Sequence, residues 1–228
     1  MYAVIVDGTR RVLEFAADAG VTRLMLTSSG AVYGPQPPEL PHLPETYHGA
    51  PVTAYGKGKL HAEQLCTEAG SQLGFIALLP RCFAFVGPYL NLNIHFAIGN
   101  FIRDCLAGRP IVIQGDGTPL RSYLYAADLA EWLWAILLKG EHARPYNVGS
   151  DEAISIRDLS YKVRAYAGTD TPVTIQGAPV PNVPPARYVP SIERARNELG
   201  LYPRCPLDEA IRRIFAWQRE SRATGTGS

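Results

Sequence analysis

The chain has 228 residues, of which 46% are hydrophobic, 19% charged and 10% aromatic, and its formal net charge is +1. This profile is typical of a globular protein with one substantial domain, or one domain and a small annex. Balanced charge without a basic or acidic block argues against a nucleic-acid partner. The apolar runs are too short to cross a bilayer and no signal peptide is evident, so we expect a cytoplasmic protein with no membrane partner.

The four cysteines are scattered along the chain, at Cys66, Cys82, Cys105 and Cys205. They form no CxxC pair and have no histidine at metal-ligand spacing. We therefore expect reduced thiols and no metal site.

The first predicted element is an amphipathic helix over 7–20 that ends at a glycine. A buried strand over 21–29, a proline-rich loop over 35–51, a helix from Thr53 and a second buried strand over 74–87 follow. Helices that alternate with continuous apolar strands predict a parallel sheet covered on both faces.

Beyond Gly87 the pattern loosens and becomes a mixture of helices and short strands. We expect helices over 95–108, 126–140, 155–168, 191–200 and 207–220, short strands over 110–115 and 144–150, and an extended segment over 169–190. Ser155 with Asp158 three residues later is an acidic variant of the capping box.

The stretch "TAYGKGK" at 53–59 begins a helix with two glycines, each of which costs roughly 1 kcal/mol relative to alanine. We expect that the missing side chains at Gly56 and Gly58 let a bound molecule lie against this helix. Tyr55 and Lys59 are one turn apart, so the lysine is placed to stabilise an ionised phenol that exchanges protons near neutral pH. A Y-x-x-x-K pair alone is frequent by chance.

A second polar stretch, "LTSSGAVYG" at 26–34, follows the first buried strand, at the carboxyl end where open parallel sheets bind ligands. Together with "YGKGK", "RCFAFVGP", "GDGTPLRSYLYAADLA" and "YNVGS", in this order, it resembles the extended short-chain dehydrogenase/reductase family. This family contains the NAD-dependent epimerases and dehydratases of nucleotide sugars. The resemblance extends from Val6 to about Trp217.

The resemblance implies a catalytic site of Ser29, Tyr55 and Lys59. Ser29 corresponds to the catalytic serine or threonine, and Tyr55 to the general acid/base. Lys59 corresponds to the lysine that also binds the nicotinamide ribose, so Tyr55 and Lys59 are both expected at the cofactor.

The resemblance also implies binding residues and partners. Phe83 falls where the backbone passes the nicotinamide, Arg121 matches an arginine that clamps the diphosphate of the substrate, and Arg187 is expected to be a second such arginine. With Ser29, these arginines would bind a nucleotide-diphosphate sugar. The implied cofactor is NAD, with NADP as the alternative, and the implied assembly is a homodimer.

Four positions depart from the family pattern. Gly30 and Ala31 stand where dehydrating members carry an Asp–Glu pair, which disfavours dehydration. Ile5 replaces an asparagine that supports the active-site helix, and Ala84 replaces an asparagine that binds substrate.

The glycine-rich turn that binds the dinucleotide has no counterpart before Val6, and "GDGTPL" at 115–120 reads as a turn. The family order implies about three further strand–helix units, on the order of 80–100 residues at ~30 per unit. We expect an α/β fold with a partial doubly wound, Rossmann-type parallel sheet and a smaller mixed α/β substrate-binding region. The sheet domain comprises 1–88 and 118–150, the substrate-binding region 89–117 and 151–217, and a flexible tail 218–228.

The predicted function is an NAD(P)-dependent epimerase, or a keto-sugar oxidoreductase, that acts on a nucleotide-diphosphate sugar. Three alternatives stay open: a catalytically inactive remnant that binds a sugar nucleotide or partners only, a nucleotide-sugar 4,6-dehydratase, and a one-way reductase that uses NADPH.

Overall fold

The central feature of the fold is a parallel sheet, seen here in a computed structural model that describes residues 1–94 and 96–223. Within these residues the sheet has four strands around β3 (Ile76–Cys82). On one side of β3 lie β1 (Arg23–Met25) and β2 (Ser28–Ser29) in succession, and on the other lies β8 (Pro145–Val148). The predicted parallel sheet is confirmed.

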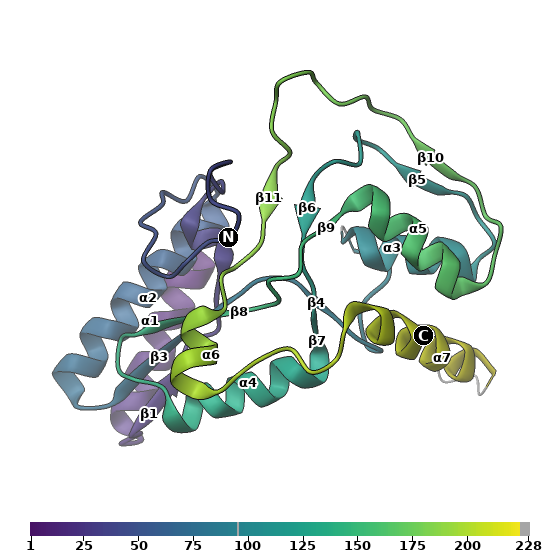
Figure 1. The fold of residues 1–228 in the computed structure, drawn as a ribbon. Coiled ribbons are helices and arrows are strands. Elements are labelled where there is room, and N and C mark those ends of the chain that lie inside the picture. Colours follow the sequence, from purple (N-terminus) through teal and green to yellow (C-terminus); the bar gives the residue numbers. More distant parts are fainter. Residues whose placement is uncertain (95, 224–228) are drawn as a thin grey trace.

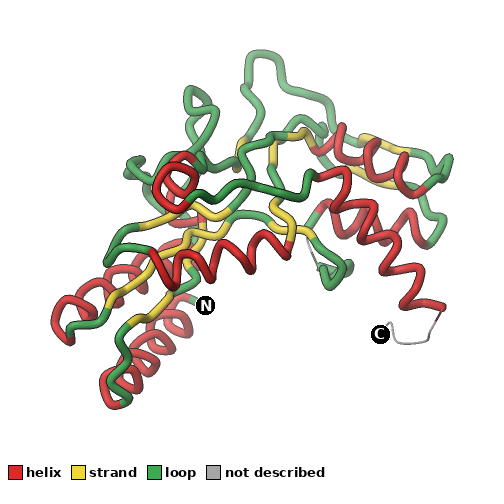
Figure 2. Tube along the Cα trace, turned by 60° about the horizontal axis from the view of Figure 1, so that its bottom comes forward, coloured by secondary structure: helices red, strands yellow, loops and turns green. Residues whose placement is uncertain are grey.

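Both faces of the sheet are covered by helices, as Figure 1 and Figure 2 show. One face packs on α1 (Tyr2–Asp18) and α2 (Ala54–Leu73), and the opposite face packs on α4 (Ala126–Lys139) and α6 (Glu193–Leu199). Successive residues of β3 point in opposite directions, so Leu79 joins the first of these cores and Leu78 the second.

A second lobe contains α3 (Ala97–Leu106), α5 (Ile156–Ala167) and α7 (Leu207–Ala223), together with the parallel pair β5 (Ile111–Ile113) and β10 (Val173–Ile175). Its core is aliphatic and aromatic. The predicted capping box is present, because Ser155 Oγ accepts a hydrogen bond from the Asp158 amide at 2.9 Å and donates one to the Asp158 carboxylate at 2.6 Å.

Two small sheets connect the lobes. One pairs β4 (Phe85–Val86) with β7 (Leu124–Tyr125), and the other has the order β11 (Arg187–Tyr188), β6 (Leu120–Arg121) and β9 (Ile154–Ser155). The second of these sheets lies beside the carboxyl ends of β2 and β3, where the predicted site residues gather.

Several boundaries differ from the prediction. Helix α1 begins at Tyr2, because residues 2–6 continue its amphipathic pattern and bury Val6. Helix α7 continues to Ala223, so residues 218–223 of the predicted flexible tail are helical, and 224–228 lie outside the described residues. The segment around α6, which lies in the predicted substrate-binding region, packs its apolar side chains into the core of the main sheet. The division into two regions stays a prediction.

No helix in the described part of the chain is both long and apolar enough to span a membrane.

Candidate active site

The first turn of α2 positions Tyr55 and Lys59. The helix is capped by Thr53, whose Oγ1 accepts the Gly56 amide at 3.0 Å. Lys59 Nζ donates to the Thr27 carbonyl at 2.8 Å and lies 5.9 Å from the centroid of the Tyr55 ring. The lysine therefore joins the helix to the carboxyl end of the β1–β2 segment, while Tyr55 remains 38% exposed.

The two glycines of this turn do not face a ligand, so our interpretation of them was wrong. A Cβ on Gly56 would lie 2.5 Å from the Ala31 carbonyl oxygen, and one on Gly58 would lie 3.2–3.3 Å from atoms of Ile5. Both glycines are buried against protein. Gly56 allows the segment after Ser29 to contact the helix, and Gly58 allows α1 to pack closely on α2. Ile5, which replaces the expected asparagine, supports the active-site helix by this apolar contact.

Ser29 ends β2 and is 7% exposed. Its Oγ caps the short 3₁₀ helix η1 (Gly30–Tyr33) by accepting the Ala31 amide at 3.2 Å. A Cβ on Gly30 would lie 2.7 Å from both the Phe83 ring and the Tyr188 hydroxyl. The space after Ser29 is thus filled, and an acidic side chain at position 30 has no room.

Tyr188 is the residue on which the predicted groups converge, and the sequence analysis missed it. Burial raises the pKa of Tyr188 to about 12, and the hydrogen bond to Ser29 and the charge of Arg121 oppose that rise, whereas Tyr55 adds to it. The Tyr188 ring also lies 4.6 Å, centroid to centroid, from that of Phe83. Phe83 therefore packs on this phenol, Ser29 is hydrogen-bonded to it, and Arg121 is the register partner of Tyr188 on β6.

The two predicted diphosphate arginines are not brought together. In the pairing of β11 with β6, Arg121 lies opposite Tyr188 and Arg187 lies opposite Leu120. Because neighbouring residues of a strand point to opposite faces, Arg187 faces away from Arg121. Because side chains alternate along a strand, only one of Arg187 and Tyr188 can lie on the same face of the sheet as Arg121. The sequence does not tell which one, because that depends on how β11 is aligned with β6.

Behind the site, a buried polar network crosses the sheet under α2. Glu63 accepts hydrogen bonds from Ser28 Oγ at 2.5 Å and from Arg81 Nε and Nη2 at 3.0 and 2.7 Å. The Arg81 guanidinium lies 4.7 Å from the Tyr33 ring, and the Tyr33 hydroxyl donates to Asn147 Oδ1 at 2.7 Å. Burial raises the pKa of Tyr33 to about 12, so its phenol stays protonated and is unsuited to act as a base.

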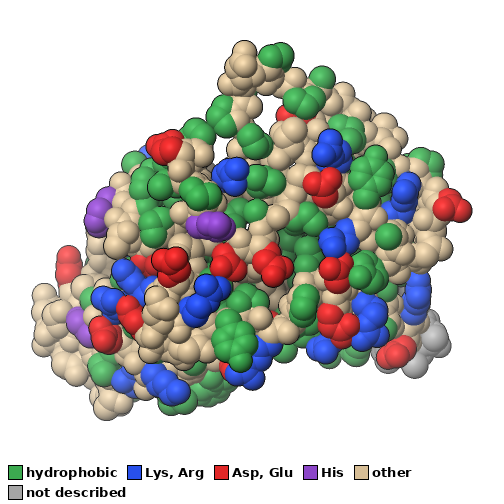
Figure 3. Space-filling view, viewed as in Figure 1, with side chains coloured by type: hydrophobic (Ala, Val, Ile, Leu, Met, Phe, Trp, Pro, Cys, Tyr) green, Lys and Arg blue, Asp and Glu red, His purple; other side chains and the backbone are tan. Residues whose placement is uncertain are grey.

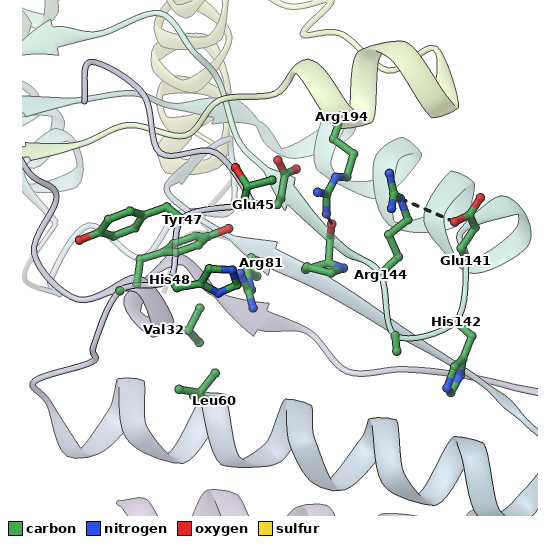
Figure 4. Close-up of a pocket in the computed structure, with 15 residues that line it drawn as sticks. Val32, Glu45, Tyr47, His48, Leu60, Arg81, Glu141, His142, Arg144 and Arg194 are labelled. Atoms are coloured by element: carbon green, nitrogen blue, oxygen red, sulfur yellow. Dashed lines mark hydrogen bonds and ion pairs between the residues drawn. The ribbon is translucent and has the colours of Figure 1, made fainter. Parts of the chain in front are cut away.

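A cavity of about 580 Å³ lies on the α2 side of β8 and contains none of the predicted site residues (Figure 4). Its wall includes Val32, Glu45, His48, Leu60 and His142. Two of its guanidinium groups are in ion pairs, Arg81 with Glu63 and Arg144 with Glu198, and Arg194 donates to the neutral Pro145 carbonyl. Because this cavity contains none of the residues that the family resemblance implies, we favour the Ser29 site.

The charge pattern of one face and the possible metal ligands of the described residues can be stated directly. On the face in Figure 3, acidic and basic side chains are interspersed. Within residues 1–94 and 96–223, no group of three or more His, Cys, Asp or Glu side chains is arranged to hold a metal ion.

Comparison with known proteins agrees with this fold. The profile of the NAD dependent epimerase/dehydratase family matches residues 1–149. UDP-glucuronic acid decarboxylase 1 of Arabidopsis thaliana is 31% identical over 216 residues, which are 92% of this chain and 48% of that protein. The chain thus spans about half the length of the curated relatives it matches.

Two solved structures share the fold. UDP-glucose 4-epimerase from Thermotoga maritima with UDP-glucose has a TM-score of 0.88 at 22% identity, with 97% of this chain and 71% of that chain covered. RMD from Pseudomonas aeruginosa with NADPH has a TM-score of 0.86 at 24% identity, with 96% and 74% covered. From the profile match over more than half of its length, the chain belongs to the NAD-dependent epimerase/dehydratase family.

Proposed function

We propose that the protein is an NAD(P)-dependent epimerase of a nucleotide-diphosphate sugar, with Ser29, Tyr55 and Lys59 as its catalytic residues. The observation that carries the proposal is the contact of the Tyr55–Lys59 helix with the Ser29 segment at the carboxyl end of the sheet: Lys59 Nζ donates to the Thr27 carbonyl and lies beside the Tyr55 ring, and Gly56 packs on the Ala31 carbonyl. Ligands of open parallel sheets bind at this end of the strands.

In the proposed mechanism, the Tyr55 phenolate removes the proton from a sugar hydroxyl as that carbon is oxidised. The Ser29 hydroxyl donates a hydrogen bond to the same oxygen and stabilises its developing charge. Lys59, held by the Thr27 carbonyl, places its ammonium 5.9 Å from the centroid of the Tyr55 ring, on the side of the helix that faces the Ser29 segment. Tyr55 then returns the proton when the keto-sugar is reduced on its other face.

The residues present fit the nicotinamide end of a dinucleotide. Lys59 and Tyr55 lie beside the carboxyl end of the β1–β2 segment, and Lys59 would bind the ribose hydroxyls. Phe83, whose amide donates to the Val148 carbonyl at 3.0 Å, would line the nicotinamide. When bound, the cofactor supplies the acceptor and donor of hydride. NAD and NADP are distinguished at the adenosine ribose, by a residue about 20 positions after the glycine-rich turn, and the sequence given has no counterpart of that turn.

The expected preference for epimerisation over dehydration has a steric basis. Dehydration needs an acid to protonate the leaving hydroxyl. The space beside Gly30 is taken by the Phe83 ring and the Tyr188 hydroxyl, so a carboxylate at this position would require both to move.

The test is Tyr55→Phe, which removes the phenol oxygen and keeps the ring. With UDP-glucose and NAD we expect turnover to fall by about 10²–10⁴-fold, the range for loss of a general acid/base. Lys57→Met is the matched control, because Lys57 is an exposed lysine of the same helix turn. Undiminished turnover by Tyr55→Phe would refute the mechanism.

A second candidate is decarboxylation of a nucleotide-sugar acid, favoured by the 29–31% identity to UDP-glucuronic acid decarboxylases. The hydroxyl β to the carboxylate would lose its proton to Tyr55 while its carbon loses hydride to the bound cofactor, which makes a β-keto acid. Loss of CO₂ leaves its electron pair in an enolate, which is then protonated, and the resulting ketone would take the hydride back. Release of CO₂ from UDP-glucuronic acid, without conversion of UDP-glucose, would select this reaction.

The inactive remnant remains an alternative, because a partial dinucleotide site would bind the cofactor weakly. Calorimetric titration with NAD distinguishes an active enzyme from an inactive remnant. Micromolar affinity for NAD would contradict the hypothesis that the chain is an inactive remnant. A homodimer and a cytoplasmic location stay predictions.

A further inference from the structure

The face of β6 and β11 that looks toward Ser29 carries one cation and one neutral phenol. Arg121 and Tyr188 are register partners on this face, and Arg187 points away from it. A substrate that spans from Ser29 to Arg121 must therefore pass Tyr188. No sequence motif drew attention to this residue, because its position depends on the register of two strands 66 residues apart, from 121 to 187.

The Tyr188 side chain is held by contacts on two sides. Its ring packs on Phe83 at 4.6 Å, and its hydroxyl occupies the space that a side chain at Gly30 would need. These contacts leave the phenol little freedom to rotate away. A polar group fixed before the substrate arrives loses less conformational entropy on binding.

The chemistry of the phenol fits a donor to a neutral oxygen. With its pKa raised to about 12 by burial, Tyr188 stays protonated over the physiological range. The Ser29 and Tyr188 hydroxyls are hydrogen-bonded to each other when no substrate is bound. Each hydroxyl proton can rotate, so in a complex the Ser29 proton can turn to the reacting oxygen and the Tyr188 proton to a second oxygen of the sugar.

We propose that Tyr188 is a further substrate-binding residue, whose hydroxyl donates a hydrogen bond to an uncharged oxygen of the sugar ring, between the reacting hydroxyl at Ser29 and the diphosphate at Arg121. This inference rests on the proposed function. It divides recognition in two: Arg121 binds the charged diphosphate, and Tyr188 binds the sugar.

The test is Tyr188→Phe, which retains the ring on Phe83, measured by calorimetric titration of the protein with UDP-glucose and with UDP. We expect about a 5–10-fold loss of UDP-glucose affinity, as for one neutral hydrogen bond, and less than a twofold change for UDP. The loss is expected to be the same at 50 and 300 mM NaCl. For Arg121→Met, both ligands should lose affinity, and this loss should shrink at high salt.

Arg187→Met is the control, because the Arg187 side chain lies on the opposite face of the β6–β11 pair from Tyr188 and Arg121. Its affinities for UDP-glucose and for UDP should stay within twofold of the wild type. Tyr188→His keeps a ring and an N–H donor and should lose less than threefold, which tests the same bond if Tyr188→Phe folds poorly. Two results would refute the role of Tyr188 and leave the proposed function standing, provided that the wild-type protein binds UDP-glucose. In the first, Tyr188→Phe binds UDP-glucose as tightly as the wild type does. In the second, its affinity for UDP falls as much as its affinity for UDP-glucose. If the wild type binds neither ligand, the proposed function fails as well.

Discussion

The two edges of the main sheet differ in how their outward backbone groups are satisfied. At β8, the Asn147 amide donates to Glu45 Oε1 at 2.9 Å, and the Pro145 carbonyl accepts from Arg194 Nη1 at 2.8 Å. The Asn147 side chain, which is fully buried, also donates to the carbonyls of Leu43 and Ser191 at 2.8 and 3.1 Å. Side chains therefore complete this edge where a further strand would otherwise pair.

At β1 the outward groups have no such partners. The Leu26 amide donates to the Leu78 carbonyl of β3. Amides of successive residues in a strand point in opposite directions, so the Met25 amide points away from β3. Within the described residues it has no hydrogen-bond acceptor. The helices beside this edge expose large apolar side chains: Phe15 of α1 is 71% exposed, and Trp134 and Leu138 of α4 are 64% and 65% exposed. An open edge between two apolar flanks has the character of an inner strand.

A sheet edge is closed by specific polar side chains and not by burial alone, as the contrast between β8 and β1 shows.

The largest change in stability is expected for a substitution at Asn147. Asn147→Leu removes the partner of the Tyr33 hydroxyl and of two carbonyls, and buried polar groups without partners cost about 1–3 kcal/mol each. We expect the free energy of unfolding in urea to fall by roughly 3–5 kcal/mol. Asn197→Leu, at an exposed position of α6, should change it by less than about 0.5 kcal/mol.

The second prediction compares the two outward amides directly. By hydrogen exchange, the Asn147 amide should exchange at least about 100-fold more slowly than the Met25 amide, because the first is buried and bonded and the second is open. The Leu24 amide points toward β3 and is the control within the same strand. It should also exchange slowly. Equal rates for Met25 and Asn147 would mean that the β1 edge is covered.

The smallest expected effect concerns Glu45 and pH. Burial raises the pKa of Glu45 above its ordinary value of 4.5, and this outweighs the hydrogen bond from Asn147 and the charges of Arg194 and Arg81. Folding thus disfavours the ionised form, so this contribution to stability is complete below about pH 4.5 and is lost as pH rises through the folded-state pKa.

Glu45→Gln keeps an acceptor for the Asn147 amide and cannot ionise. Relative to the wild type it should be more stable at pH 7, and the difference should shrink toward pH 4, as measured by urea unfolding across this range. A variant less stable than the wild type at pH 7 would show that pairing with Arg194 outweighs burial.

The parts of the fold that follow from local patterns were predictable. Apolar periodicity located the helices and the parallel strands, and Ser155 with Asp158 located a helix start, because each signal lies within a few residues. The face of Arg187 was not predictable, since a shift of one residue in strand register reverses it. The roles of Gly56 and Gly58 were also hidden, because a missing side chain does not reveal which neighbour approaches.

The contact between Gly56 and the Ala31 carbonyl has one more consequence. Gly56 follows Tyr55 and Ala31 lies two residues after Ser29, so the two proposed catalytic residues are joined by main chain packed on main chain, with no rotatable side chain between them. The distance between them is therefore fixed by the backbone. Under the proposed function, changes meant to alter which sugar is bound are better directed at Phe83, Arg121 and Tyr188 than at Ser29 and Tyr55.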